Sequence, residues 1–89
     1  MPYISRDQRI ELDMGRRPVD AGELNYWITD AILYYLSKIV GRDTMKLRPS
    51  YTDYNEVIGV LECVKLELYR RKVAPHEDDA KERNGDVYE

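Results

Sequence analysis

The sequence predicts an all-α protein: an antiparallel two-helix hairpin, preceded by a short N-terminal helix, followed by an acidic C-terminal tail, in chains that self-associate. Apolar residues recur at three- and four-residue spacings over two long segments. Each of these segments opens with a capping pattern. The length of 89 residues fits one small domain. We expect that domain to span residues 1–74, with residues 75–89 as a tail or docking arm.

The first element is a short helix that ends near Met14. Ser5 and Gln8 stand three residues apart, the spacing at which a hydroxyl and a carboxamide cap each other's backbone N–H groups. Gly15 follows and is suited to ending a helix, because glycine adopts left-handed backbone angles without strain.

The first long helix is predicted to begin near Asp20, which caps the backbone while Glu23 reaches back from the third helical position. Pro18 suits an extended entry, and Gly41 supplies a stop signal. One apolar face repeats at helical spacing: Leu24, Trp27, Ile28, Ala31, Ile32, Tyr35 and Ile39.

The second long helix is predicted to begin near Thr52 or Asp53, after a connection of about ten residues that could form an extended strap. Asp53 and Glu56 repeat the capping pattern. We expect the helix to end around Val73, because Pro75 lacks a backbone N–H and restricts the residue before it. Its apolar stripe is Val57, Leu61, Val64 and Leu68.

Both long helices carry a second apolar set away from the main stripe. A hairpin covers only one face of each helix, so the second faces predict burial between copies of the chain. The alternative is that the N-terminal segment folds over one of them within the same chain. The candidate interface residues are Tyr26, Leu33, Leu36, Val40, Gly59, Cys63 and Leu66.

The charges are distributed unevenly. The chain carries a net charge of −3, which disfavours a general nucleic-acid binder. Residues 74–89 alone carry −4 and contain only two large apolar side chains, Val87 and Tyr88. Such a segment buries too little surface to order by itself, so it predicts a mobile tail or an arm that docks on a neighbouring surface.

The remaining composition limits the function classes. A single cysteine rules out an internal disulfide framework and a cysteine-rich zinc site. No apolar run approaches the roughly 18 residues that span a bilayer, and no signal-peptide pattern opens the chain, so we expect no membrane contact and a cytoplasmic location.

Groups for catalysis are few, so we expect no enzyme, no cofactor and no metal. His76 precedes an acidic run, which we interpret as a solvated charged segment rather than a set of metal ligands. Cys63 lies within an apolar stretch and is interpreted as structural. The carboxylates on the helices lack the Glu-x-x-His pattern of di-iron bundles and are interpreted as caps or solvated residues: Glu23, Asp30, Glu56, Glu62 and Glu67.

The densest basic cluster is a candidate anion site, because Arg forks match phosphate geometry and Tyr stacks on bases. It consists of Tyr69, Arg70, Arg71 and Lys72. Further basic residues that could add to it are Arg16, Arg17, Lys46 and Arg48. The alternative is that the cluster compensates the helix dipole and pairs with the acidic tail of the same or another chain.

Several sequence blocks are distinctive in combination: Gly22–Tyr26, Val57–Cys63, Lys65–Glu67, Tyr69–Arg71, Val73–Pro75 and Asn84–Tyr88. Together they resemble a family of small proteins of unknown function encoded mainly by bacteriophages and bacteria. The resemblance implies a phage accessory protein in the cytoplasm of the infected cell. We expect a non-enzymatic helical oligomer that binds a host protein. The alternative is a protein that sequesters a nucleotide or cyclic nucleotide signal against host defence.

Overall fold

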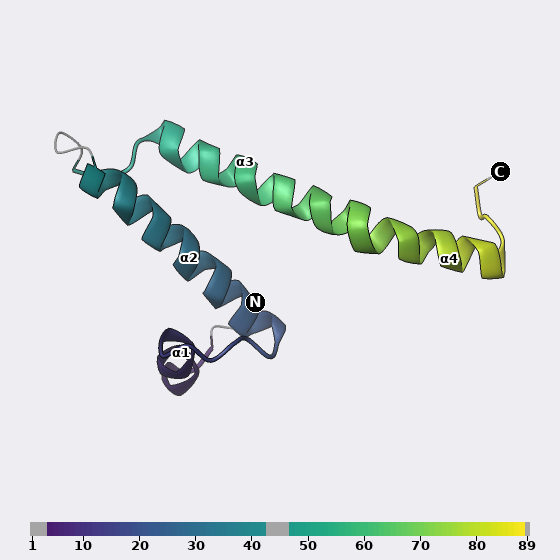
Figure 1. Cartoon of the computed structure of the whole chain (residues 1–89), viewed down its shortest axis with the longest axis horizontal. Coiled ribbons are helices and arrows are strands. Elements are labelled where there is room, and N and C mark those ends of the chain that lie inside the picture. The colour runs from purple at the N-terminus through teal and green to yellow at the C-terminus, as the bar shows by residue number, and fades with distance from the viewer. Residues whose placement is uncertain (1–3, 43–46, 89) are drawn as a thin grey trace. The chain divides into compact units, whose positions relative to one another are not determined.

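The computed structural model describes residues 4–42 and 47–88, and all regular structure in these ranges is helical (Figure 1). The prediction of an all-α fold is therefore confirmed. The elements are α1 (Arg6–Asp13), α2 (Ala21–Arg42), α3 (Tyr51–Leu68), a π-helical turn η1 (Tyr69–Val73) and α4 (Ala74–Asn84). Of the described helices, none combines the length and the apolar character that crossing a bilayer requires.

The chain divides into two compact units, residues 1–53 and residues 54–89. In the first unit α1 packs against α2 (Figure 1). The second unit contains most of α3 together with η1 and α4, which follow one another as one long helical rod.

The short N-terminal helix forms as predicted. The Gln8 backbone N–H donates to Ser5 Oγ at 3.2 Å, and the Ser5 N–H donates to Gln8 Oε1 at 2.8 Å. The helix closes at Met14, and Gly15 follows with a φ of 109°, a value that favours glycine. Leu12 is 4% exposed and anchors α1 in the first unit.

The predicted cap of α2 is confirmed, with one difference. The Glu23 N–H donates to Asp20 Oδ1 at 2.8 Å, as an N-cap requires. The Glu23 carboxylate, however, accepts from the Val19 N–H at 3.0 Å, one residue before the cap. The helix runs to Arg42, one residue past the predicted stop at Gly41. Of the predicted strap, residues 43–46 lie outside the described residues, and residues 47–50 form neither helix nor strand.

The second long helix begins slightly earlier than predicted. Ser50, rather than Asp53, is the N-cap: the Asp53 N–H donates to Ser50 Oγ at 3.2 Å, and Asp53 Oδ2 accepts from the Ser50 N–H at 2.8 Å. Asp53 is therefore the third-position partner of the cap. This reciprocal pair satisfies the free backbone N–H groups about one turn earlier than a cap at Asp53 would.

The prediction that the helix ends at Val73 is wrong. The Ala74 N–H donates to the Tyr69 carbonyl, five residues back, so η1 is one residue wider than an α-helical turn. Pro75 follows in the first turn of α4, where its missing N–H costs little. The helical path then continues to Asn84 and ends at Gly85, whose φ is 84°. Residues 75–84 of the predicted tail are thus helical.

Candidate functional site

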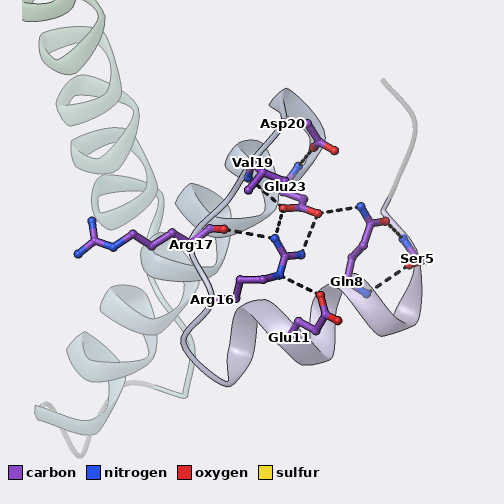
Figure 2. Close-up of polar contacts among 8 residues, drawn as sticks. All are labelled: Ser5, Gln8, Glu11, Arg16, Arg17, Val19, Asp20 and Glu23. Carbon is purple, nitrogen blue, oxygen red and sulfur yellow. Dashed lines mark hydrogen bonds and ion pairs between the residues drawn. The ribbon is translucent and has the colours of Figure 1, made fainter.

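The most buried charged side chain in the described part of the chain belongs to Glu23, in the first turn of α2. Its residue is 2% exposed. Figure 2 shows the polar groups that converge on its carboxylate from α1 and from the segment that links α1 to α2. These groups form a cluster that we call the Glu23 clasp, made of Gln8, Glu11, Arg16, Val19 and Glu23.

Each oxygen of the Glu23 carboxylate accepts two hydrogen bonds. Arg16 donates through Nη1 to Oε1 and through Nη2 to Oε2, both at 2.9 Å. Gln8 Nε2 donates to Oε2 at 2.9 Å, and the Val19 N–H donates to Oε1 at 3.0 Å. The bidentate Arg–carboxylate geometry is the strongest form of this interaction.

The charge in the clasp is strongly stabilised. The hydrogen bonds from Arg16 are the main cause that lowers the pKa of Glu23 to about 2, while burial of the carboxylate opposes this shift. In return, the hydrogen bond to Glu23 raises the pKa of Arg16 above its ordinary value. Arg16 also donates through Nε to Glu11 Oε2 at 2.9 Å, so the arginine joins two carboxylates.

This geometry gives the clasp a structural role. A general base needs an accessible lone pair and a pKa near the working pH, and Glu23 has neither. Of the two roles expected for Glu23, a cap or a solvated residue, the solvated one is therefore wrong. Arg16 is held in ion pairs rather than available for an external anion. The clasp joins α1 to α2.

The candidate interface residue Tyr26 is half-buried on α2. Its phenol donates to Asp13 Oδ1 at 3.1 Å, which links α2 to the end of α1. Burial is the larger cause that raises the pKa of the phenol, and the hydrogen bond to Asp13 adds to it. At this point of α2 the N-terminal segment of the same chain already contacts the candidate interface.

The other candidate interface residues differ in exposure. Leu33 on α2 and Leu66 on α3 are each 58% exposed, Val40 is half-buried and Leu36 is buried. Cys63 is an exposed thiol. At Gly59 an added Cβ would meet nothing within 4 Å, so that position of α3 is open on its outer side.

The basic cluster lies on η1 and is exposed. Glu67, one turn earlier, accepts from Arg70 Nη2 at 2.9 and 3.1 Å and from Arg71 Nε at 2.8 Å. Both arginine side chains remain 71% exposed. Within the described residues their ion pairs therefore run to Glu67 on the same rod. Arg17 and Arg48 are exposed elsewhere, and Lys46 lies outside the described residues.

A hollow of about 460 Å³ lies where the chain leaves α4. Lys81 pairs with Asp86 at 3.3 Å, which holds the arm after Gly85 near the helix end. Val87 and Tyr88 line the hollow yet are 84% and 87% exposed. No group of three metal-capable side chains gathers anywhere in residues 4–42 or 47–88, His76 and its acidic neighbours included.

Comparison with known proteins places the chain in a family whose function is not known. A family model described as "Domain of unknown function (DUF6899)" matches residues 1–87. The chain belongs to this family. No curated protein and no solved structure matches the chain. The match agrees with the resemblance to an uncharacterised family.

The Glu23 clasp of this DUF6899 protein was missed by the sequence analysis. Gln8 lies on another helix and Arg16 in the non-helical link, so no spacing within one helix connects either of them to Glu23. One signal was present: Arg16 directly follows the predicted glycine stop, at a point where the chain must turn back toward the next helix.

Proposed function

We propose that this protein is a small phage accessory protein without catalytic activity, which forms a helical homo-oligomer in the host cytoplasm and acts by binding a host protein. One observation carries the proposal: no residue from 58 to 88 is buried, although this segment holds many large apolar side chains. Helical rods of this kind bury their apolar residues against partners.

The exposed apolar side chains lie on more than one face of α3. Val64 and Leu68 belong to the main stripe and are 56% and 58% exposed. Val60 and Leu66 lie off that stripe and are 60% and 58% exposed. We propose that α2 and α3 pair as an antiparallel hairpin at the Val57 end of the main stripe, where Val57 is already buried. Copies of the chain and the host protein then cover the exposed remainder, Val64 and Leu68 included.

The absence of catalysis in this proposal is supported by the state of Glu23. The pKa of this buried carboxylate is strongly lowered, and its oxygens are saturated by Arg16, Gln8 and Val19. Strongly shifted groups often mark active sites, but here the shift comes from a structural ion pair.

The test is a double substitution, Val64→Glu with Leu68→Glu. We expect the wild-type chain to sediment as an oligomer at micromolar concentration and the variant as a monomer. Thr52→Glu with Asn55→Glu adds the same charge to exposed polar positions of α3 and should leave association unchanged. A monomeric wild-type chain would contradict the proposed self-association.

Host-protein binding is tested with the same variants. A protein that copurifies from host cells is identified by mass spectrometry, purified, and titrated against wild-type chain by calorimetry. We expect Val64→Glu with Leu68→Glu to weaken that binding at least about tenfold, since it removes apolar contacts. Equal affinity of both forms would contradict the proposed binding surface.

A second candidate function is sequestration of a phosphate-bearing signal such as a cyclic nucleotide. The basic cluster favours it, because Arg70 uses only Nη2 and Arg71 only Nε in their bonds to Glu67, while Tyr69 is 55% exposed beside them. Calorimetry with ATP, cyclic AMP and cyclic di-GMP tests this function. Binding that is lost in Arg70→Ala with Arg71→Ala, but kept in Arg83→Ala, would support it over host-protein binding.

A further inference from the structure

The charges on either side of the junction between η1 and α4 have opposite signs. Three basic residues, Arg70 to Lys72, are followed by four uncharged positions if His76 is neutral, and then by three acidic residues, Glu77 to Asp79. The midpoint lies between Ala74 and Pro75. A two-fold axis at that point would place these three basic residues of one copy level with the three acidic residues of the other.

We infer that two copies of the chain pair antiparallel along this rod, with the two-fold axis near Ala74 and Pro75. The inference rests on the proposed self-association and specifies its surface and direction. Arg70 then lies level with Asp79 of the second copy, Arg71 with Asp78 and Lys72 with Glu77, and each match occurs twice. Successive side chains point about 100° apart on a helix, so these long side chains pair around the flanks of the contact rather than along one line. A parallel pairing in register would set like charges against each other, which is destabilising.

The charged groups are available for this pairing. Among the described residues, the carboxylates of Glu77, Asp78 and Asp79 make no hydrogen bond or ion pair within their own chain. Arg70 and Arg71 each keep guanidinium nitrogens that Glu67 does not engage. All six side chains are exposed, and long basic side chains reach across a helix interface.

The same register also places an apolar residue of the second copy near the exposed C-terminal arm. Along the helical rod, residues whose numbers add to about 149 lie level with each other, so Gly85, where the arm leaves α4, lies level with Val64 of the second copy. Figure 1 shows the arm leaving the end of α4. Val64, Val87 and Tyr88 are 56%, 84% and 87% exposed in the single chain. Exposed ion pairs contribute little affinity, so the charges set the direction while these apolar contacts supply the affinity.

The π-helical turn changes which face of α4 meets the second copy. Its extra residue rotates everything after it by about 100° relative to a regular α-helix. With this rotation Ala80, rather than Asp79, lies in line with Val64 and Leu68 along the rod. Ala80 is half-buried, and its small side chain allows a second helix to approach closely.

Charge reversal tests the pairing. Arg70→Glu, Arg71→Glu and Lys72→Glu in one chain should weaken self-association at least about tenfold, because acids then face acids. Reversal of Glu77, Asp78 and Asp79 to Lys should do the same. A chain with all six reversals has the wild-type net charge and should associate within about threefold of wild type. With helicity confirmed by circular dichroism, a folded six-fold variant that stays monomeric would overturn the inference.

A spin label on the single cysteine tests whether the two copies run antiparallel. A nitroxide label on the exposed Cys63 should give an inter-label distance of about 35 Å, since the residue lies about 11.5 positions from the axis at 1.5 Å per residue. Moving the label by Cys63→Ser with Glu82→Cys should shorten the distance to about 22 Å. A distance near 10 Å at residue 63, the spacing of parallel packed helices, overturns the antiparallel pairing but leaves self-association intact. The absence of any dipolar signal contradicts self-association itself.

Discussion

At the scale of single residues, Glu23 does most to connect the N-terminal part of the chain. Its carboxylate accepts from Gln8 on α1, from Arg16 in the link and from the Val19 backbone, while its own N–H is capped by Asp20. A buried carboxylate is tolerated only when its charge is matched and its lone pairs are filled. Both conditions are met here, so the clasp fixes where α1 lies on α2.

The clasp predicts a specific pH dependence of stability. The pKa of Glu23 is about 2 in the folded chain against an ordinary 4.5, so its stabilisation is fully present above about pH 4.5 and is lost as the pH falls toward 2. Glu23→Gln should lower the Tm at pH 7 by on the order of 10 °C. The difference between wild type and variant should shrink as the pH falls through this window, measured by circular dichroism.

Glu11→Gln is the matched control for this measurement. Glu11 also pairs with Arg16, accepting from the arginine Nε. The Glu11 side chain is 59% exposed, so its replacement should lower the Tm by no more than a few degrees. Parallel pH profiles for wild type and Glu23→Gln would show that the clasp does not carry the expected charge.

The sequence predicted the local half of this site and missed the other half. Ser5 with Gln8 and Asp20 with Glu23 stand three residues apart, and the backbone geometry of a helix start makes such pairs recognisable. The convergence of Gln8 and Arg16 on Glu23 depends on how α1 folds back, which follows from packing rather than from spacing.

At the scale of elements, Pro75 does not end the helical rod. A proline inside an α-helix removes a hydrogen bond and clashes with the carbonyl four residues back. η1 absorbs both effects, because the Ala74 N–H bonds to the Tyr69 carbonyl and the wider turn precedes the ring. The stop at Val73 was predicted from the rule for regular α-helices, and that rule does not include an extra residue upstream of the proline.

Replacement of the proline tests this explanation. In Pro75→Ala the new N–H can donate to the Arg71 carbonyl, so the turn should return to α-helical geometry. We expect amide exchange of residues 72–76 to slow at least about tenfold, measured by NMR. Ala80→Ser leaves the turn unchanged and serves as the control. Unaltered exchange in Pro75→Ala would mean that the π turn has another cause.

At the scale of the whole molecule, the all-α class followed from periodicity and capping, and Ser5, Asp20 and the short helix were predicted correctly. The long-range contacts were not predicted, because few side chains are buried and little in the apolar pattern of the sequence specifies which helices meet. Leu12 is the main apolar anchor of α1, whereas the rod from residue 58 onward has no buried side chain.

The exposed charges of this rod predict that self-association weakens with salt. Raising NaCl from about 50 to about 500 mM shortens the screening length from about 14 to about 4 Å, so pairing between Arg71 and Asp78 should lose most of its strength. We expect the dissociation constant from sedimentation equilibrium to rise at least about threefold. A tighter complex in high salt would indicate that apolar contacts alone hold the copies together.

The sparse packing of the rod also bears on how long a chain survives in a cell. Unpacked helices open locally at little cost, and proteases cleave the opened form. Arg70, Arg71 and Lys72 place three consecutive cleavage points for trypsin-like enzymes in an exposed turn. A solitary chain is therefore expected to be a good proteolytic substrate. In the proposed oligomer this turn would be shielded, so degradation would remove the copies that stay unassembled.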